Sequence, residues 1–532
     1  MKRLTFLLMI TVTFSGCQKV FKEDGLNQLP MNSPEDLKFA LSGLYYRFAS
    51  IAIAYYGGFP TIQLENADDV NYLPGCEQGG FSIAPSEEEL LSIYKPFYQT
   101  IASANDILQK SEQINTSDPV IRHLLGEAYF IRAYSYYWLV RVFGQVPIID
   151  NVDVNYSVKK SSFTEIYNFI ITDLQKAISL LPNSNNEARI KYVTPHRGSA
   201  KALLAEVYLT GAGYPLKDTR MYADAAKLAG EVIDSADYFG FGLMTDFADL
   251  WNGKHEVNQE SIFSLYSSGS KLSWNDPKYN TDNNSGNYLA TDLYFSGPRM
   301  GWADGPLAAV KFYNSSPKSY RKDMTYQNRL FYIQYPTPCS PDSLNPEIWH
   351  CPKPDTLMYD LDTIDLCHVM YFKKYYTNVN MPDTILEQNF NLRSPFFLNY
   401  GNVIYLLRYA HTLLTYAEAK ARSGNIDASA YEAINQVRRR ANKVDLFAPS
   451  VYDLKQGLTP EQFEDSVVWE RAWEFCAEPE GRWFDLLRLE MVRKMSSLKY
   501  PSGGVLFPIK IDMETYFLSL PKTDQMLDPY LQ

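Results

Sequence analysis

Clustered positive charge is missing from this sequence. Its 532 residues include 50 Lys and Arg against 61 Asp and Glu, giving a net charge of −11 and a pI near 5.2. No run of basic residues occurs beyond the extreme N-terminus. Because proteins bind nucleic acid largely by setting Lys and Arg against backbone phosphates, these values argue against nucleic acid as a partner.

Cysteine is scarce, and the motifs of covalent and cofactor chemistry are missing. The six cysteines include no pair with the two-residue spacing of a zinc or redox motif. The sequence has no Gly-rich phosphate loop, Ser nucleophile elbow or dinucleotide fingerprint. A chain of 61.0 kDa also buries enough apolar surface to need neither disulfides nor metal for stability. We therefore expect no cofactor, no metal site and no catalytic residues.

The first 17 residues have the three regions of an export signal. Two basic residues precede an uncharged apolar stretch over residues 4–14, and Cys17 follows behind two small residues. That stretch is too short to span a bilayer, and no later stretch approaches the length needed. Small residues directly before a cysteine resemble the lipobox of bacterial lipoproteins, so Cys17 is the expected lipidation site and residues 18–30 a polar tether. An ordinary signal peptide with an incidental cysteine is the alternative.

Apolar residues at helical spacing predict a first block of helices. The pattern predicts amphipathic helices over residues 165–181, 200–208 and 222–233. Residues 124–143 are apolar nearly all round, which is typical of a helix inside a bundle. Paired helices with small residues at their crossings suggest tetratricopeptide-like stacking.

A second helical block is predicted in the last third of the chain. One apolar face begins at Ile404 and continues to Ala421, and a partner helix is expected over residues 430–441. Thr459 is a good N-cap because a proline follows it in the first helical turn, and the helix is expected to continue through Phe475. A further helix is predicted over 483–495.

Between the two blocks, residues 238–400 lose this periodicity. Gly, Asn, Pro, Ser and aromatic residues dominate there, which predicts loops and short strands. Long irregular segments on a rigid scaffold usually carry the binding site, so this insert is the expected ligand-facing region. An excursion without a binding role is the alternative.

Aromatic residues are unusually frequent, at 14% of the chain with 40 Tyr and 8 Trp. An exposed aromatic ring stacks on the apolar face of a sugar, so an excess of rings suits a surface that binds amphipathic ligands. A tyrosine-rich core is the alternative explanation. The candidate ligand-binding residues are Trp274, Tyr279, Tyr288 and Trp302 in the insert, and Tyr72 and Phe81 in the Gly-rich loop that follows Asp68-Asp69.

Several motifs, in the expected order, resemble the SusD/RagB family of outer-membrane nutrient-binding proteins. Residues 126–134 read GEAYFIRAY, and residues 142–147 read VFGQVP. Further matching segments lie within 173–182, 202–209, 407–419, 433–438, 470–486 and 506–509. Two positions depart from the pattern: His411 stands where the family usually has an acidic residue, and Asp528-Pro529-Tyr530 shortens its usual ending.

The resemblance implies a mainly α fold of four tetratricopeptide-like helix pairs with an irregular second part. It also implies a lipid-anchored protein on the outer-membrane surface of Bacteroidota, which captures oligosaccharide for a SusC-like TonB-dependent transporter. A binder of peptide or another nutrient on the same scaffold is the alternative. The expected divisions are 1–17 signal peptide, 18–30 tether, 31–237 N-terminal helical region, 238–400 insert and 401–532 C-terminal helical region.

Some charged residues would suit an enzyme. A glycosidase needs two carboxyl groups on opposite sides of a glycosidic bond. The candidates for such a carbohydrate-active enzyme are Glu470, Glu474, Glu478, Glu480 and Asp485, with Arg471 and Arg482 nearby. A structural network is the favoured interpretation, because arginines commonly bind carboxylates in pairs and at helix ends.

Two further groups of residues could hold metal ions. Cys339, His350, Cys351, Cys367 and His368 could bind zinc, but their irregular spacing and an oxidising compartment favour a disulfide or free thiols. Residues 282–286 offer oxygens to calcium, yet they lack the pattern of a calcium loop and more closely match a turn.

Overall fold

The computed structural model describes most of the helical part of the chain. It describes residues 31, 33–53, 67–71, 87–111, 117–152, 158–251, 255, 257–266, 307–308, 310–326, 329–334, 340–341, 349–350, 355–360, 403–492, 494–495 and 516–527.

Long helices make up both ends of the described chain. The N-terminal ones are α1 (Pro34–Ile53), α3 (Glu87–Lys110), α4 (Pro119–Phe143), α5 (Phe163–Leu180), α6 (Arg197–Gly211) and α7 (Met221–Asp234). The C-terminal ones are α13 (Tyr409–Arg422), α14 (Ala428–Ala441), α15 (Pro460–Glu474) and α16 (Arg482–Arg488). The shorter helices are α8 (Ala236–Phe239), η2 (Phe247–Leu250), α10 (Val310–Ser315), α11 (Tyr320–Thr325) and α18 (Lys522–Leu527).

Four antiparallel strand pairs accompany the helices in the described residues. Strand β1 (Val70–Asn71) pairs with β3 (Leu307–Ala308), and β2 (Ser261–Tyr266) pairs with β8 (Val403–Arg408). The other two pairs are β4 (Arg329–Gln334) with β7 (Asp355–Asp360), and β5 (Ser340–Pro341) with β6 (Trp349–His350).

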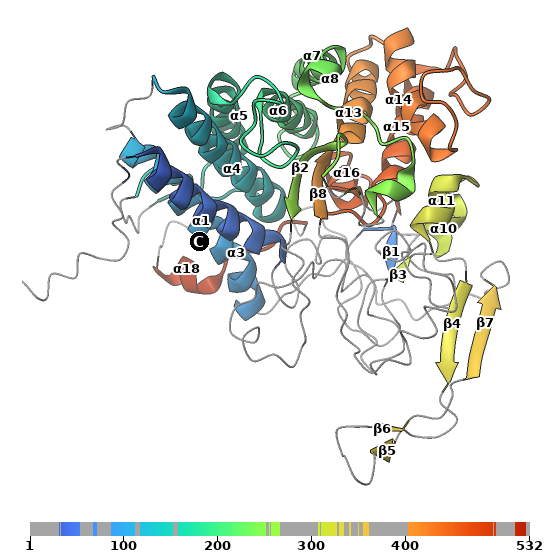
Figure 1. The fold of residues 1–532 in the computed structure, drawn as a ribbon, viewed down its shortest axis with the longest axis horizontal. Helices are drawn as coiled ribbons and strands as arrows, with labels where there is room; N and C mark the ends of the chain where they lie inside the picture. Colours follow the sequence, from blue (N-terminus) through green and yellow to red (C-terminus); the bar gives the residue numbers. More distant parts are fainter. Residues whose placement is uncertain are drawn as a thin grey trace, which may run out of the picture.

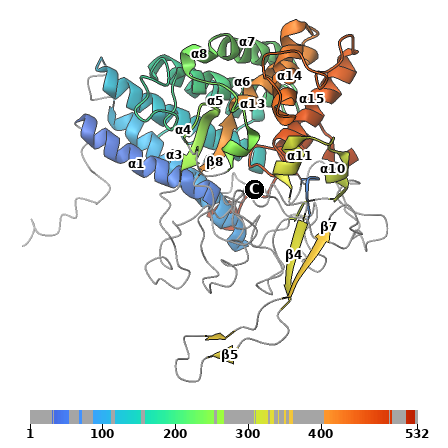
Figure 2. The same cartoon turned by 45° about the vertical axis from the view of Figure 1, so that its right-hand side comes forward.

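The long helices stack in chain order. Helix α3 packs on α1, α4 on α3, and the same neighbour-to-neighbour contact continues through α5, α6 and α7. Helix α13 then packs on α7, and α14 and α15 both pack on α13, so the C-terminal block continues the N-terminal stack. Figures 1 and 2 show this curved helical layer, with β2 and β8 along its inner side. The predicted mainly α fold with tetratricopeptide-like helix pairs is confirmed.

Local sequence explains where these helices begin. Asp118 caps α4 by accepting a hydrogen bond from the Val120 amide, and a proline occupies the first helical position. A reciprocal capping box between Ser162 and Glu165 begins α5. Thr459 begins α15, as its position before a proline predicted.

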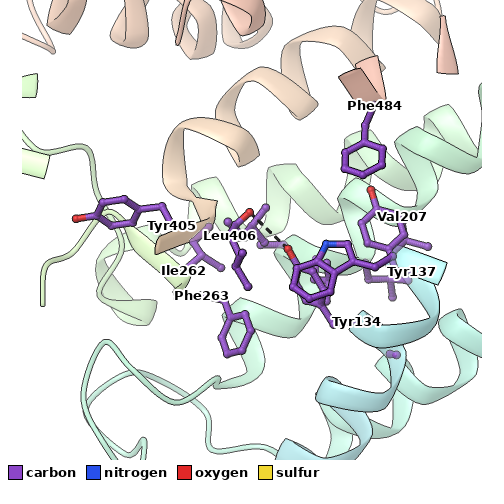
Figure 3. Packing of buried hydrophobic residues seen from close by; sticks show 14 of the residues in the cluster. Tyr134, Tyr137, Val207, Ile262, Phe263, Tyr405, Leu406 and Phe484 are labelled. Atoms are coloured by element: carbon purple, nitrogen blue, oxygen red, sulfur yellow. Dashed lines mark hydrogen bonds between the residues drawn. The ribbon is translucent and has the colours of Figure 1, made fainter. Parts of the chain in front are cut away.

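The core forms where helix α4 meets the β2–β8 strand pair. Twenty of the residues of α4 are buried, which confirms the prediction of a helix inside the bundle. Tyr134 packs against Phe263 of β2 with ring centroids 5.7 Å apart, and its hydroxyl donates to the Leu406 carbonyl of β8 at 3.4 Å. Figure 3 shows these side chains together with Ile262 and Tyr405. Aromatic packing therefore fixes the strand pair against the helical layer.

Two helix predictions were wrong. Residues 403–408 form strand β8, and the helix begins only at Tyr409. All six residues of β8 are buried, so the strand shows no apolar–polar alternation and its pattern cannot be told from a buried helix. The helix predicted over 483–495 is interrupted after Arg488, where Glu490 has a positive φ of 55°, and residues 492 and 494–495 are helical again.

The structure also contains elements that the sequence pattern did not predict. Helices α1 and α3 lie in a region where no individual helix was predicted, and α10 and α11 lie within the insert, where only loops and strands were expected. Among the described residues, no helix combines the length and apolarity needed to cross a bilayer.

Two glycines provide a matched test of helix packing. A Cβ on Gly126 of α4 would lie 2.9 Å from the backbone nitrogen of Leu181, whereas a Cβ on Gly43 of α1 would meet nothing within 4 Å. We expect Gly126→Ala to lower the free energy of unfolding by about 1–3 kcal/mol through overpacking. Gly43→Ala should raise it by about 0.5–1 kcal/mol, because alanine is the better helix former. Urea unfolding measures both, and equal effects of the two substitutions would contradict this packing.

Candidate functional site

The residues proposed from sequence to contact ligand cannot be compared with the structure. Trp274, Tyr279, Tyr288, Trp302, Tyr72 and Phe81 all lie outside the described residues, as does the expected lipidation site Cys17. The same holds for Cys339, Cys351, Cys367 and His368 and for the possible calcium loop at 282–286, while His350 is described only as part of β6. Their roles remain predictions, and the described residues show how the segments that carry them are attached.

The larger part of the insert, after strand β2, leaves and rejoins the scaffold at one place. Tyr266, the last residue of β2, pairs with Val403, the first residue of β8, in the antiparallel register. Residues 267–402 therefore begin and end at neighbouring points on the inner side of the helical layer.

A second strand pair joins the loop that holds Tyr72 to the end of the segment that holds Trp302. Asn71 of β1 pairs with Leu307 of β3, and the strands are antiparallel. Tyr72 directly follows Asn71, and Trp302 lies five residues before Leu307. The chain beyond Asn71 and the chain before Leu307 therefore leave this pair at the same end.

Two buried aspartates hold β1 against the C-terminal block. Asp68 accepts two hydrogen bonds from Arg482, one from Nε at 2.7 Å and one from Nη2 at 3.0 Å. Asp69 accepts a hydrogen bond from the Ala477 amide at 2.7 Å. Both aspartates are fully buried, so the loop that begins at Tyr72 starts from a fixed point.

Arg408, the last residue of β8, lies at the centre of a buried ionic cluster. Its Nε and Nη2 donate to both carboxylate oxygens of Glu478 at 3.0 and 2.9 Å, and Nη1 donates to Glu260 at 2.5 Å. Nη1 also donates to the Glu474 carboxylate at 2.9 Å, and Nη2 to the Glu474 carbonyl at 3.3 Å. All five N–H groups of this fully buried guanidinium therefore have acceptors.

Two more arginines complete the same cluster. Arg440 of α14 donates to Glu260 at 2.6 Å and to Glu474 at 2.5 Å. Arg321 of α11 donates to Glu470 at 2.7 Å and to Glu474 at 2.9 Å. Helix α11 follows β3 in the chain, so these bonds fasten the part of the insert that contains β3 and α11 to α15.

A second buried cluster joins α6, α13, α15 and α16. Arg471 donates to Asp485 at 2.9 Å and to Glu206 at 2.8 Å. Arg488 donates to both oxygens of Glu418 at 2.5 and 2.7 Å and to Asp485 at 2.9 Å. Helices of the N-terminal and C-terminal blocks are thus linked by ion pairs as well as by apolar contact.

Glu480 lies in the turn between α15 and α16 and links this turn to helix α4. Its carboxylate accepts hydrogen bonds from Arg141 at 2.6 and 3.1 Å and from the Tyr134 hydroxyl at 3.0 Å. The indole N–H of Trp138 also donates to it. These contacts hold the turn after α15 against the central helix of the N-terminal block.

His411 fits the network as a neutral ring. Its Nδ1 accepts a hydrogen bond from the Arg408 amide at 3.1 Å, and its ring stacks on Phe475 with centroids 3.6 Å apart. Burial, together with the nearby charges of Arg408 and Arg471, lowers the pKa of His411 well below its usual value. The departure from the family's acidic residue therefore adds no buried charge.

The low pKa of the Glu474 and Asp485 carboxyl groups does not suit the general acid of a glycosidase. Burial opposes ionisation of Glu474, but Arg440, Arg408 and Arg321 lower its pKa to about 2. Arg471 and Arg488 likewise outweigh burial and hold the pKa of Asp485 well below its usual range. A general acid must keep its proton near neutral pH, and these groups cannot. The interpretation of a structural network is confirmed.

Sequence reasoning missed several members of this network. Arg408, Arg440, Glu260 and Arg321 were not singled out, although Arg408 ends a run of five apolar residues, which is a detectable sign of a buried charge. Within the part of the chain that the structure describes, no group of three or more His, Cys, Asp or Glu could hold a metal ion.

Comparison with known proteins agrees with this architecture. Residues 78–209 match a family described as "Starch-binding associating with outer membrane", and residues 398–507 match the SusD family. A SusD-like protein of Formosa agariphila is 24% identical over an alignment that covers 98% of this chain and 96% of that protein. Two stretches of the chain match SusD-family descriptions, and SusD-like relatives are similar to it over nearly its full length. SusD-family proteins are non-catalytic binding proteins, and the description matched by residues 78–209 names association with the outer membrane.

Solved structures with this SusD-like fold extend over nearly the whole chain. A SusD homologue from Bacteroides thetaiotaomicron has a TM-score of 0.74 at 23% identity, with 94% of this chain and 96% of that chain covered. Surface glycan-binding protein A from the same species, in complex with laminarihexaose, has a TM-score of 0.65 at 18% identity, with 94% and 98% covered.

The charge network generates a test of the scaffold. We expect Arg408→Met to lower the free energy of unfolding by about 3–5 kcal/mol, because it leaves the buried carboxylates of Glu260, Glu474 and Glu478 without their cation. Chemical denaturation followed by circular dichroism measures the loss. Arg220→Met is the matched control, because Arg220 forms a solvent-exposed pair with Asp218 and its loss should leave stability unchanged. An Arg408→Met protein as stable as the control would refute the network's structural role.

Proposed function

We propose that the protein captures an oligosaccharide at the outer-membrane surface and delivers it to a SusC-like TonB-dependent transporter. It works by binding and release, without making or breaking bonds. The proposed ligand contacts are the six aromatic residues of the insert and of the loop after β1. The proposed divisions of the chain stay those expected from sequence, with residues 238–400 as the ligand-facing insert.

The observation that carries this proposal is the β1–β3 pair. It holds the chain next to Tyr72 beside the chain that continues from Trp302, and five extended residues span at most about 18 Å. Aromatic rings from two distant parts of the sequence can therefore share one ligand. Such a group of rings, carried on a rigid scaffold, suits the apolar faces of successive sugar units.

A ligand titration tests the oligosaccharide site. We expect the soluble chain from Gln18 onward to bind one or more oligosaccharides in isothermal titration calorimetry. Trp274→Ala and Trp302→Ala should each weaken the affinity about 3- to 10-fold, the loss expected for one stacked ring. Phe447→Ala is the control, because Phe447 is 78% exposed in the loop between α14 and α15.

Other outcomes of this titration have definite meanings. Unchanged affinity in both folded tryptophan variants would place the site elsewhere. Heat from a peptide panel, with none from oligosaccharides, would favour the alternative of a peptide-binding protein on the same scaffold.

We also infer that Cys17 carries the lipid anchor. The chain from Cys17 to the start of α1 at Pro34 can extend about 55 Å, which lets the helical body lie beside a membrane protein at the surface. Cys17→Ala should abolish incorporation of labelled palmitate and release the protein from the outer-membrane fraction. Retention of the label in this variant would refute the anchor.

A further inference from the structure

Residues 68–71, here called the clasp, connect three parts of the molecule. Their aspartates bind the turn at residues 475–482, their strand β1 pairs with β3, and the loop that holds Tyr72 follows directly. Gly481 keeps this turn tight, because a Cβ there would lie 2.5 Å from the Phe475 carbonyl oxygen. The clasp therefore docks on a rigid surface of the C-terminal block.

The two aspartates of the clasp differ in how fully their carboxylate oxygens are hydrogen-bonded. Arg482 gives Nε and Nη2 to the two oxygens of Asp68, so the charge of Asp68 is paired directly. Asp69 uses one oxygen to accept from the Ala477 amide, and its other oxygen has no hydrogen-bond partner within the described chain. A buried carboxylate with one uncompensated oxygen is costly in its ionised form.

Arg482 attracts the charge of Asp69, but its Nε and Nη2 are bound to Asp68, and its buried Nη1 has no hydrogen-bond partner among the described residues. Tyr326, the residue after α11, contacts the Cys476 thiol at 3.2 Å, and burial raises the pKa of this phenol well above its usual value, so it stays neutral near Asp69. Arg321 of the same helix is bound to Glu470 and Glu474.

The charged groups of the adjoining turn and of α16 have other partners too. Glu478 is bound to Arg408, Glu480 to Arg141, and Asp485 to Arg471 and Arg488. Two charges act on Asp69: the carboxylate of Asp68, which repels it, and the guanidinium of Arg482, which attracts it.

We propose that Asp69 is a proton-dependent positioning residue: when its carboxyl takes up a proton, the clasp docks more firmly and holds the ligand-facing loop in place. The effect on ligand binding rests on the proposed function above, whereas the docking itself does not. Asp69 differs in this respect from the other buried acids among the described residues, because each of those is paired with an arginine.

The direction of the pH dependence follows from the burial and from Asp68. Together they raise the pKa of Asp69 in the docked clasp from 3.8 to about 6. An undocked, solvated Asp69 has the ordinary value, so docking takes up a proton between about pH 4 and pH 6. Docking is therefore strengthened as pH falls through 6, and the docking constant should be about tenfold higher at pH 5 than at pH 7.5.

Hydrogen exchange on the full chain in detergent measures docking without any ligand. We expect protection of the β1 and β3 amides, relative to the β2 and β8 amides, to be about tenfold greater at pH 5 than at pH 7.5. Asp69→Asn should remove this step, because a neutral amide mimics the protonated carboxyl. Asp218→Asn, which neutralises a partly exposed aspartate remote from the clasp in sequence, should keep it.

Each outcome supports or overturns the proposal. If the protection of the β1 and β3 amides relative to the β2 and β8 amides is the same at pH 5 and pH 7.5 in the wild-type chain, proton-linked docking is overturned. This outcome decides the matter even if Asp69→Asn fails to fold. A step in exchange with no rise in oligosaccharide affinity at pH 5 overturns the positioning role. Failure of every oligosaccharide to bind refutes the proposed function. The pH dependence of hydrogen exchange then tests only whether docking of the clasp takes up a proton.

Discussion

The buried guanidinium of Arg408 constrains the rest of the scaffold. Removing such a charge from water costs several kcal/mol unless every N–H group finds an acceptor in the interior. Its acceptors come from the residue before β2, from the end of α15 and from the turn beyond it. The strand pair and the last helices must therefore reach their final positions together, or a charge is left buried and unpaired.

The same chemistry extends to the edge of the proposed ligand-facing region. Arg321 fastens α11, and Arg482 fastens the chain before β1, each by bonds to a buried carboxylate. Apolar packing sets how closely the helices approach, since core side chains tolerate some exchange of shape. Charge pairing adds a requirement for particular partners, and it applies to the segments that carry the proposed ligand contacts.

How much of this could be predicted depended on the range of the interactions. The N-cap of α15 was predicted because Thr459 stands directly before a proline in the first helical turn. Strand β8 was not, because it is buried on both faces and pairs with β2 across the whole insert. The ionic partners of Arg408 lie 66 to 148 residues away, and a single sequence carries no information on such pairing. The ligand-contacting aromatic residues remain predictions from composition and position.

The pairing of Tyr266 with Val403 has an evolutionary consequence. Since both ends of residues 267–402 meet at one strand pair, a change in length that spares β3 and α11 lengthens or shortens a loop closed at a fixed base. Doubling the length of such a loop costs only about 0.6 kcal/mol in closure entropy. The proposed ligand-facing region can thus change in length almost independently of the helices. Selection for a new nutrient would meet little resistance from the requirements of folding.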